Sequence, residues 1–350
     1  RIYLDAKTRT YNSAYDRLLH TQLQWLDRQI RQNLSAKVCE ETAEFYKLHS
    51  HLSFYYWNDV MRRILLGVVC PRMLKQGNAV RALQLANMAD NHLLNIVDKE
   101  FSVHTGRHYL DPSQSQPHSI THYRYDSDQF NPNDYSNHFF EMIDSLGVNT
   151  VRKYIQNVDA PKTEFDRYLN ARGYTGMDYL NDIVGTQYIR EMRYGEAVKY
   201  LANVSEAYNR HHLNVIMQYD PFCVAREFVE SDFDTRYEFA REMYSLEQAI
   251  KSEKDPNIKA QKMLKYSIGL RNSFDRCWPL TQYYRGFSYW GCVTGEKRDW
   301  ENDKYTTAAK QKAQQYAELA CQTATDKEVA ANIHYELCNF KTVAEKYPNT

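Results

Sequence analysis

The stretch GTQYIREMRYGEAVKYL, residues 185–201, has a near-copy in GVVCPRMLKQGNAVRAL, residues 67–83. Six of the seventeen aligned positions are identical, including the first glycine and the last leucine. A glycine in one helix lets a second helix pack closely, a tight turn follows at Gly77 or Gly195, and the next alanine makes another close contact. Each copy therefore predicts a helical hairpin, and such hairpins bury their apolar faces by stacking on one another.

The composition also favours helices. The 350 residues include 12 glycines and 9 prolines, which is few for a turn-rich β fold. Lys plus Arg and Asp plus Glu number 44 each, so we expect no nucleic acid partner. The longest apolar run is ILLGVVC, 64–70, much shorter than the roughly 20 residues of a membrane span, so we expect no transmembrane segment. The start at Arg1 leaves room for a leader peptide that has been removed.

Apolar residues recur at spacings of three and four through most of the chain. This period predicts one helix over 11–33, two within 36–74, and others over 78–103, 236–252 and 305–323. It predicts further helices from Asn133 to Gly147, from Pro161 to Gly173, from Asp255 to about 272, from Pro279 onward and from Thr325 through Ala344. Alanines on one face of 305–323 predict a close approach to another helix. Pro71 is expected to kink its helix or to end it early.

Residues 105–133 lack any such period. They are polar, contain three prolines and are predicted to form one long irregular loop. The chain exceeds the roughly 100–200 residues of a usual single core, so it should divide or extend as a stack. We therefore predict an all-α protein with N-terminal helical repeats over 1–104, the loop over 105–133, and C-terminal repeats over 134–350 that continue the first part.

The repeated stretch resembles the tetratricopeptide repeat (TPR). The second copy matches the family's glycine, tyrosine, alanine and apolar positions at Gly185, Tyr188, Ala197 and Leu201. The first copy matches three of them at Gly67, Ala79 and Leu83, with Cys70 in place of the tyrosine. The resemblance implies a TPR-like α-α superhelix in which the first helix of each hairpin lines a concave surface.

By the same resemblance, five side chains are expected to face that concave surface and bind a partner. They are Tyr179, Asp182, Thr186, Arg190 and Arg72. An arginine in a groove can hold a carboxylate through two parallel hydrogen bonds, whereas on a bare surface it is a solvated charge.

Two further stretches, GLRNSFDRCWPLTQYYRGF (269–287) and ELCNFKTVAEKYPNT (336–350), resemble uncharacterised helical-repeat proteins exported by Bacteroides-type bacteria. That resemblance implies a location in the bacterial cell envelope, in the periplasm or as an outer-membrane lipoprotein. It implies no activity.

The sequence contains no GxSxG, GxGxxG, phosphate-loop or HExxH motif, so we expect no catalysis and no cofactor. The seven cysteines are odd in number and form no CxxC, which favours free thiols over disulfides or a zinc site. The expected function is therefore that of a binding or scaffold protein whose concave surface takes a protein or peptide partner.

Two alternatives remain open. A glycan-binding envelope protein, similar to the helical lipoproteins of starch-utilisation systems, would use exposed aromatic clusters such as those in 54–57 and 283–290. An enzyme would build its site at the loop, where the pairs His104/His108 and His118/His122 have a spacing of four. That spacing can also suit zinc, but polar loop histidines are the default interpretation and we predict no metal site.

Overall fold

The computed structural model describes residues 14–35, 60–90, 138–173, 175–206, 208–209, 220–223, 235–275, 277, 280–281 and 304–349. Within these ranges the regular structure is helical and contains no strand, which confirms the all-α prediction. The predicted loop at 105–133 lies outside the described residues.

The chain divides into two compact units, Arg1–Leu180 and Asn181–Thr350. The division falls within α10 rather than at 105–133. Described helices of the first unit are α1 (Ala14–Ser35), a helix at 60–64 that continues through the π-helical segment η1 (Leu65–Val69) into α4 (Cys70–Lys75), a helix at 79–90, α7 (His138–Ser145), α8 (Val148–Asp159), α9 (Glu164–Asn170) and the start of α10 (Met177–Arg190). The second unit holds the rest of α10, α11 (Tyr194–Leu201), α13 (Arg236–Ser252), α14 (Pro256–Phe274), α15 (Lys304–Thr323), α16 (Lys327–Glu336) and α17 (Phe340–Lys346).

The helix at 79–90 forms the centre of the first unit, and every residue from 81 to 90 is buried. Its apolar side chains share the interior with a polar stripe in steps of three residues: Arg81, Gln84, Asn87 and Asp90. This stripe explains why residues 138–173 belong to the first unit, because the side chains of the stripe bond to α7, α8 and α9.

The bonds of the stripe join elements that are far apart in sequence. The Arg81 guanidinium lies 3.1 Å from Asp16 on α1 and 2.9 Å from Asp166 on α9. Gln84 Nε2 donates to Asn157 at 2.7 Å and to Asn170 at 3.1 Å. At the other end, Asn87 Nδ2 donates to Tyr154 OH at 2.7 Å, and Asp90 accepts from Phe139 N at 2.7 Å and pairs with Arg62 at 3.3 Å.

Pro71 does not end its helix early, because the backbone remains helical on both sides of it, and the expected kink stays a prediction. A proline has no N–H, and its ring clashes with the carbonyl four residues before it. The π-helical turn Leu65–Val69 lies just before this position, and the Cys70 N–H bonds to the carbonyl of Leu65, five residues back. The shifted hydrogen-bond register accommodates the proline without ending the helix.

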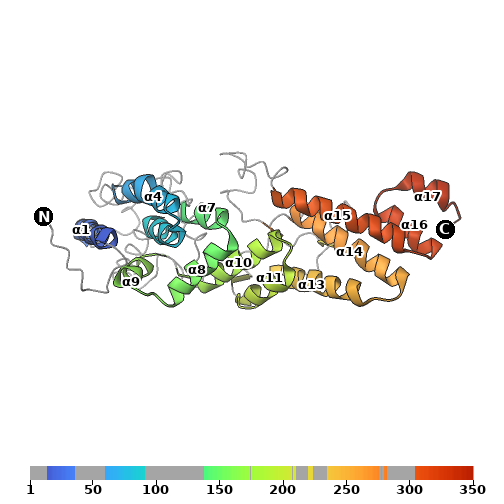
Figure 1. Cartoon of the computed structure of the whole chain (residues 1–350), viewed down its shortest axis with the longest axis horizontal. Coiled ribbons are helices and arrows are strands. Elements are labelled where there is room, and N and C mark those ends of the chain that lie inside the picture. The colour runs from blue at the N-terminus through green and yellow to red at the C-terminus, as the bar shows by residue number, and fades with distance from the viewer. Residues whose placement is uncertain are drawn as a thin grey trace. The chain divides into compact units, whose positions relative to one another are not determined.

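Helices α14 and α15 lie side by side in the second unit (Figure 1). The face of α15 that packs inward carries four buried alanines, Ala309, Ala313, Ala317 and Ala320. These small side chains let the backbones approach, so that the Ser267 hydroxyl of α14 donates to the Ala313 carbonyl at 2.7 Å. The predicted small-residue face of 305–323 is confirmed.

The hairpin of α10 and α11 shows the close approach that the glycine predicted. A Cβ placed on Gly185 would lie 2.3 Å from Cγ of Leu201, and Ala197 is fully buried. The first copy differs, because Gly67 is exposed and a Cβ there would meet nothing within 4 Å. The two copies therefore form hairpins with different contacts at the aligned glycine.

Three helices end in the same way, with one residue in the left-handed conformation. These residues are Gly77 (φ 75°), Met192 (φ 55°) and Cys338 (φ 58°). After each, the next N–H bonds to the carbonyl five residues back: Asn78 to Met73 at 2.8 Å, Arg193 to Tyr188 at 2.9 Å and Asn339 to His334 at 2.8 Å. This is the Schellman arrangement, which satisfies carbonyls that the helix end leaves open.

These turns correct two predictions. The turn of the second copy occurs at Met192, whereas Gly195 lies inside α11. The single helix predicted from Thr325 through Ala344 is two helices, because the chain turns at Cys338 between α16 and α17. The N-cap of α16 is Asp326, whose carboxylate accepts from the N–H groups of Glu328 and Val329.

Candidate functional site

The structure places the predicted binding residues in two different environments. Four of them, Tyr179, Asp182, Thr186 and Arg190, are buried on α10, whose residues 182–190 are all buried. The fifth, Arg72, is exposed on α4. Tyr179 and Arg72 belong to the first unit, and the other three belong to the second. The burial of α10 differs from the open surface that the resemblance implied, and a binding role for these residues stays a prediction.

Two of the buried residues have partners within the second unit. Asp182 Oδ2 accepts from Arg236 Nη1 of α13 at 2.5 Å and from Tyr208 OH at 3.3 Å. Arg190 Nε donates to the carbonyl of Thr281. A buried ion pair of this kind is costly to break on one side, so these contacts hold α10 in its packing.

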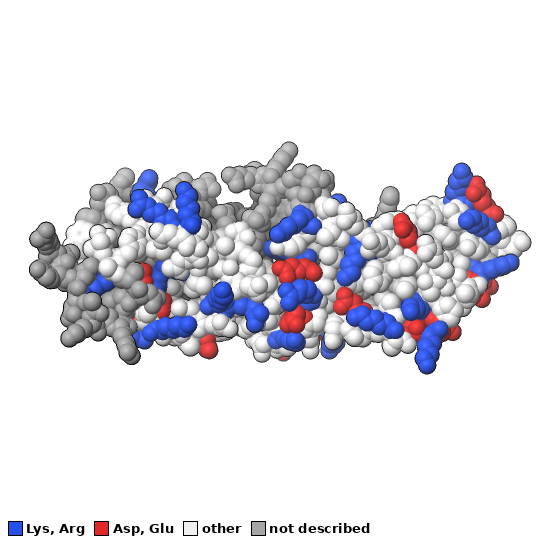
Figure 2. Space-filling view, in the orientation of Figure 1, with Lys and Arg blue, Asp and Glu red and all other residues white. Residues whose placement is uncertain are grey.

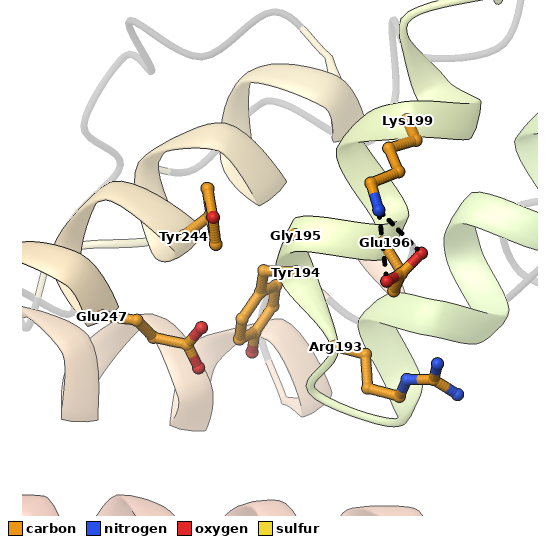
Figure 3. A pocket seen from close by; sticks show the side chains of 7 residues that line it. All are labelled: Arg193, Tyr194, Gly195, Glu196, Lys199, Tyr244 and Glu247. Carbon is orange, nitrogen blue, oxygen red and sulfur yellow. Dashed lines mark hydrogen bonds and ion pairs between the residues drawn. The ribbon is translucent and has the colours of Figure 1, made fainter.

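A surface pocket lies between the first turn of α11 and the middle of α13 (Figure 3). Its volume is about 290 Å³. Seven residues line it: Arg193, Tyr194, Gly195, Glu196, Lys199, Tyr244 and Glu247. All seven belong to the second unit.

The aromatic residues of this pocket are positioned by helix packing. Tyr194 is fully buried and meets Phe239 and Tyr266 edge to face, with ring centroids 6.2 and 6.3 Å apart. A Cβ on Gly195 would lie 2.8 Å from Cε2 of Tyr244, so the glycine makes room for this ring against α11. Tyr244 itself remains 42% exposed, which places a rotatable aromatic ring at the mouth of the pocket.

Glu247 is the acidic group on the inner side of the pocket. Its Oε1 accepts from Tyr266 OH at 2.7 Å and lies 3.6 Å from Lys312 Nζ. Burial, and after it the charge of Glu247, raise the pKa of Tyr194 well above the ordinary tyrosine value. Burial likewise raises the pKa of Tyr266 and lowers that of Lys312. Tyr194 and Tyr266 are therefore neutral near pH 7 and can donate hydrogen bonds.

One buried polar atom at the pocket has no hydrogen-bond partner among the described residues. Tyr194 OH is buried without a hydrogen bond. The contacts from Tyr266 and Lys312 meet Oε1 of Glu247, whose side chain is 21% exposed. The two side chains point toward one another in Figure 3. A buried polar group without a partner costs about 1–3 kcal/mol, so this part of the pocket favours a molecule that completes the bonds.

The charges at the rim are already paired with neighbours on the surface. Lys199 Nζ lies 3.3 Å from Glu196, as Figure 3 shows, and Arg193 lies 3.2 Å from Glu191 and 4.7 Å above the ring of Tyr188. Exposed pairs of this kind contribute about 0–1 kcal/mol and exchange readily. On the face seen in Figure 2, acidic and basic side chains are interspersed in the same way.

A second cluster joins the end of α15 to the α16–α17 turn. Cys321 Sγ and Asn339 Nδ2 both approach His334 Nδ1, at 3.7 and 3.4 Å. A nucleophile–base–orienter arrangement needs both ring nitrogens, one for the thiol and one for the orienting group. Burial raises the pKa of the Cys321 thiol and lowers that of His334, so both are neutral near pH 7. The cluster is therefore poorly suited to nucleophilic chemistry.

Other predicted features fall outside the described residues. These are the four histidines His104, His108, His118 and His122 and the aromatic clusters at 54–57 and 283–290. Within the described ranges, no group of three or more His, Cys, Asp or Glu side chains could hold a metal ion. An exposed aromatic pair, Tyr335 and Phe340, has an interplanar angle of 70°. Its rings do not form the flat platform that stacking on a sugar favours.

Sequence reasoning missed the pocket. Gly195 was assigned to a turn, although its role is to admit Tyr244, and nothing in the spacing of Tyr244 and Glu247 relates them to α11. Comparisons of the chain with protein-family models, with curated proteins and with solved structures found no match. Among the helices described, none is long and apolar enough to cross a membrane.

Proposed function

We propose that this protein is a non-enzymatic, TPR-like helical-repeat protein that binds a protein or peptide partner. The pocket between α11 and α13 carries the proposal. At about 290 Å³ it lies just below the roughly 300–1,000 Å³ range of ligand sites, which suits one side chain of a larger partner. Loosely paired charges around an exposed tyrosine form a rim suited to a peptide.

The setting of the pocket supports this function. Helix packing fixes Tyr194 and Glu247, whereas Tyr244, Lys199 and Glu196 can rearrange on the surface. A rigid floor with an adaptable rim allows a peptide to be held at low ordering cost. The location in the bacterial envelope, implied by the resemblance, belongs to the same proposal. The glycan alternative has weaker support, because the exposed pair Tyr335 and Phe340 is not coplanar.

The experiment is a selection of random short peptides displayed on phage, followed by calorimetric titration of the enriched peptides. Tyr244→Ala should weaken their binding about tenfold or more, since exposed aromatic side chains anchor partners. Tyr335→Ala is the matched control, because it removes an exposed tyrosine from α16 and should leave the affinity unchanged. Thermal unfolding of both variants verifies that each is folded.

Two results would contradict the proposal. One is the absence of any enriched peptide. The other is a set of peptides whose affinity for Tyr244→Ala equals that for the original protein. Loss of binding in Tyr335→Ala with no loss in Tyr244→Ala would place the binding surface on α16 and α17 instead.

A further inference from the structure

We infer that the pocket between α11 and α13 recognises a primary ammonium group, the side-chain head of a lysine in the partner. The inference rests on the proposed binding function and names the chemistry of that site. It starts from two groups of the pocket, the buried Tyr194 OH, which has no hydrogen-bond partner, and the partly exposed Glu247 carboxylate.

The hydrogen-bonding roles of these atoms select a donor. An ionised carboxylate oxygen only accepts, so a ligand atom that contacts Oε2 must donate. The phenol oxygen of Tyr194 can also accept through its lone pairs. A lysine ammonium carries three N–H donors on one atom and can therefore serve both oxygens at once.

The aromatic side chains favour a cation at the same place. Tyr194 lies in the pocket and Tyr244 lies at its mouth, so a ligand head between them would face aromatic rings (Figure 3). A cation within about 6 Å of a ring centroid is attracted by the negative face of the ring. Because Tyr194 is fully buried, the exposed Tyr244 ring must rotate to admit the lysine.

The charge balance also favours a cation. The two basic residues of the rim already lie beside Glu196 and Glu191. Lys312 approaches Oε1 of Glu247 at 3.6 Å, outside hydrogen-bond distance. The positive end of α11 opposes a cation, and Glu196 in its first turn is shared between this partial charge and Lys199. A carboxylate or phosphate in the pocket would instead face Glu247 directly.

The probe is N-acetyl-lysine methylamide, titrated into protein with isotope-labelled tyrosines and followed by NMR. We expect saturable shifts of the Tyr194 and Tyr244 ring signals. The Nε-acetylated probe, which has lost the charge, should bind at least about tenfold more weakly, and Glu247→Gln should weaken the lysine probe similarly. Glutamine keeps an acceptor for Tyr266, so this variant retains the packing.

The matched control is Glu253→Gln, which removes a carboxylate paired with Lys262 outside the pocket and should leave binding unchanged. Equal binding of the acetylated probe, or normal binding by Glu247→Gln, overturns the inference. Preference for N-acetyl-glutamate methylamide overturns it in favour of an anion, and preference for the arginine analogue overturns it in favour of a guanidinium.

The two proposals can fail separately. Selected peptides that require Tyr244 but contain no lysine would preserve the binding function and reject the ammonium site. Binding of the lysine probe without any enriched peptide would preserve the ammonium site and reject the peptide partner.

Discussion

Alanine substitutions at Gly185 and Gly67 should have opposite effects on stability, although the two glycines occupy aligned positions. A Cβ on Gly185 would lie 2.3 Å from Cγ and 2.4 Å from Cδ2 of Leu201. Carbon atoms pack at about 3.5–4.0 Å, so buried Leu201 must retreat by about 1 Å or more. Overpacking destabilises the folded state by about 1–3 kcal/mol, and the better helix propensity of alanine offsets up to about 1 kcal/mol of this loss. We expect Gly185→Ala to destabilise the second unit by about 1–2 kcal/mol.

Gly67→Ala is the control. The position is exposed, lies within a helical segment and has nothing within 4 Å of the added methyl group. Replacing a glycine inside a helix by alanine stabilises it by roughly 0.5–1 kcal/mol. The same chemical change should therefore stabilise the first unit.

Circular dichroism at the helical minimum, recorded against temperature and urea, measures both effects. A cost of 1–2 kcal/mol corresponds to a melting temperature about 2–8 °C lower for a unit of this size. The double variant Gly185→Ala, Leu201→Ala should lose less stability than the sum of the single variants, because the truncated leucine leaves room for the methyl group. Equal shifts for Gly185→Ala and Gly67→Ala, or strict additivity in the double variant, would refute the reasoning.

Three further predictions concern single positions. Cys338→Gly should stabilise the α16–α17 turn by about 0.5–1 kcal/mol in urea unfolding, because glycine adopts the left-handed conformation without strain; no gain would contradict this. Asp166→Asn should destabilise the first unit by about 1–3 kcal/mol near pH 7, since Arg81 loses one of its two buried carboxylate partners and keeps Asp16. Burial raises the pKa of Asp166, but Arg81 and the bonds from Thr163 outweigh burial and hold it below the ordinary value. The stabilisation from ionised Asp166 is therefore complete above the unfolded-state pKa of about 3.9 and is lost as the pH falls through the folded-state pKa. The difference in free energy of unfolding between the original protein and Asp166→Asn should therefore become smaller below about pH 4. Finally, burial raises the pKa of the Cys70 thiol to about 12, so iodoacetamide labelling mapped by mass spectrometry should find exposed Cys338 modified and Cys70 protected until the protein unfolds.

Some strongly periodic segments were predictable from sequence, including their ends. The helix expected over 236–252 occurs as Arg236–Ser252, where Thr235 accepts from the Glu238 N–H as its cap. The alanine face of α15 was also predictable, because small residues at spacings of three and four leave one arrangement that buries them. In contrast, α8 was not predicted as a separate helix, because its buried side is short: Val148, Val151 and Tyr154.

The residue that forms each helix-ending turn, and the pairs of helices that form the pocket, were not predictable from sequence. Because Gly77 and Gly195 occupy aligned positions, the sequence predicts the same turn at both. In the structure Met192 adopts the left-handed conformation instead, and Gly195 lies in close contact with Tyr244. The pocket depends on residues of α11 and α13 that are about fifty positions apart. Local sequence patterns do not predict which distant helices come into contact, because tertiary packing determines that contact.

The polar stripe of helix 79–90 has a consequence for how this sequence can diverge. Each residue of the stripe bonds to different neighbours. An apolar replacement of one residue therefore leaves a buried partner unpaired, which lowers the free energy of unfolding by about 3–5 kcal/mol where that partner is charged. Mutations on Arg81, Asp16 and Asp166 are thus tolerated chiefly as joint replacements. We expect distant descendants of this chain either to keep all three or to exchange all three for apolar residues of similar volume.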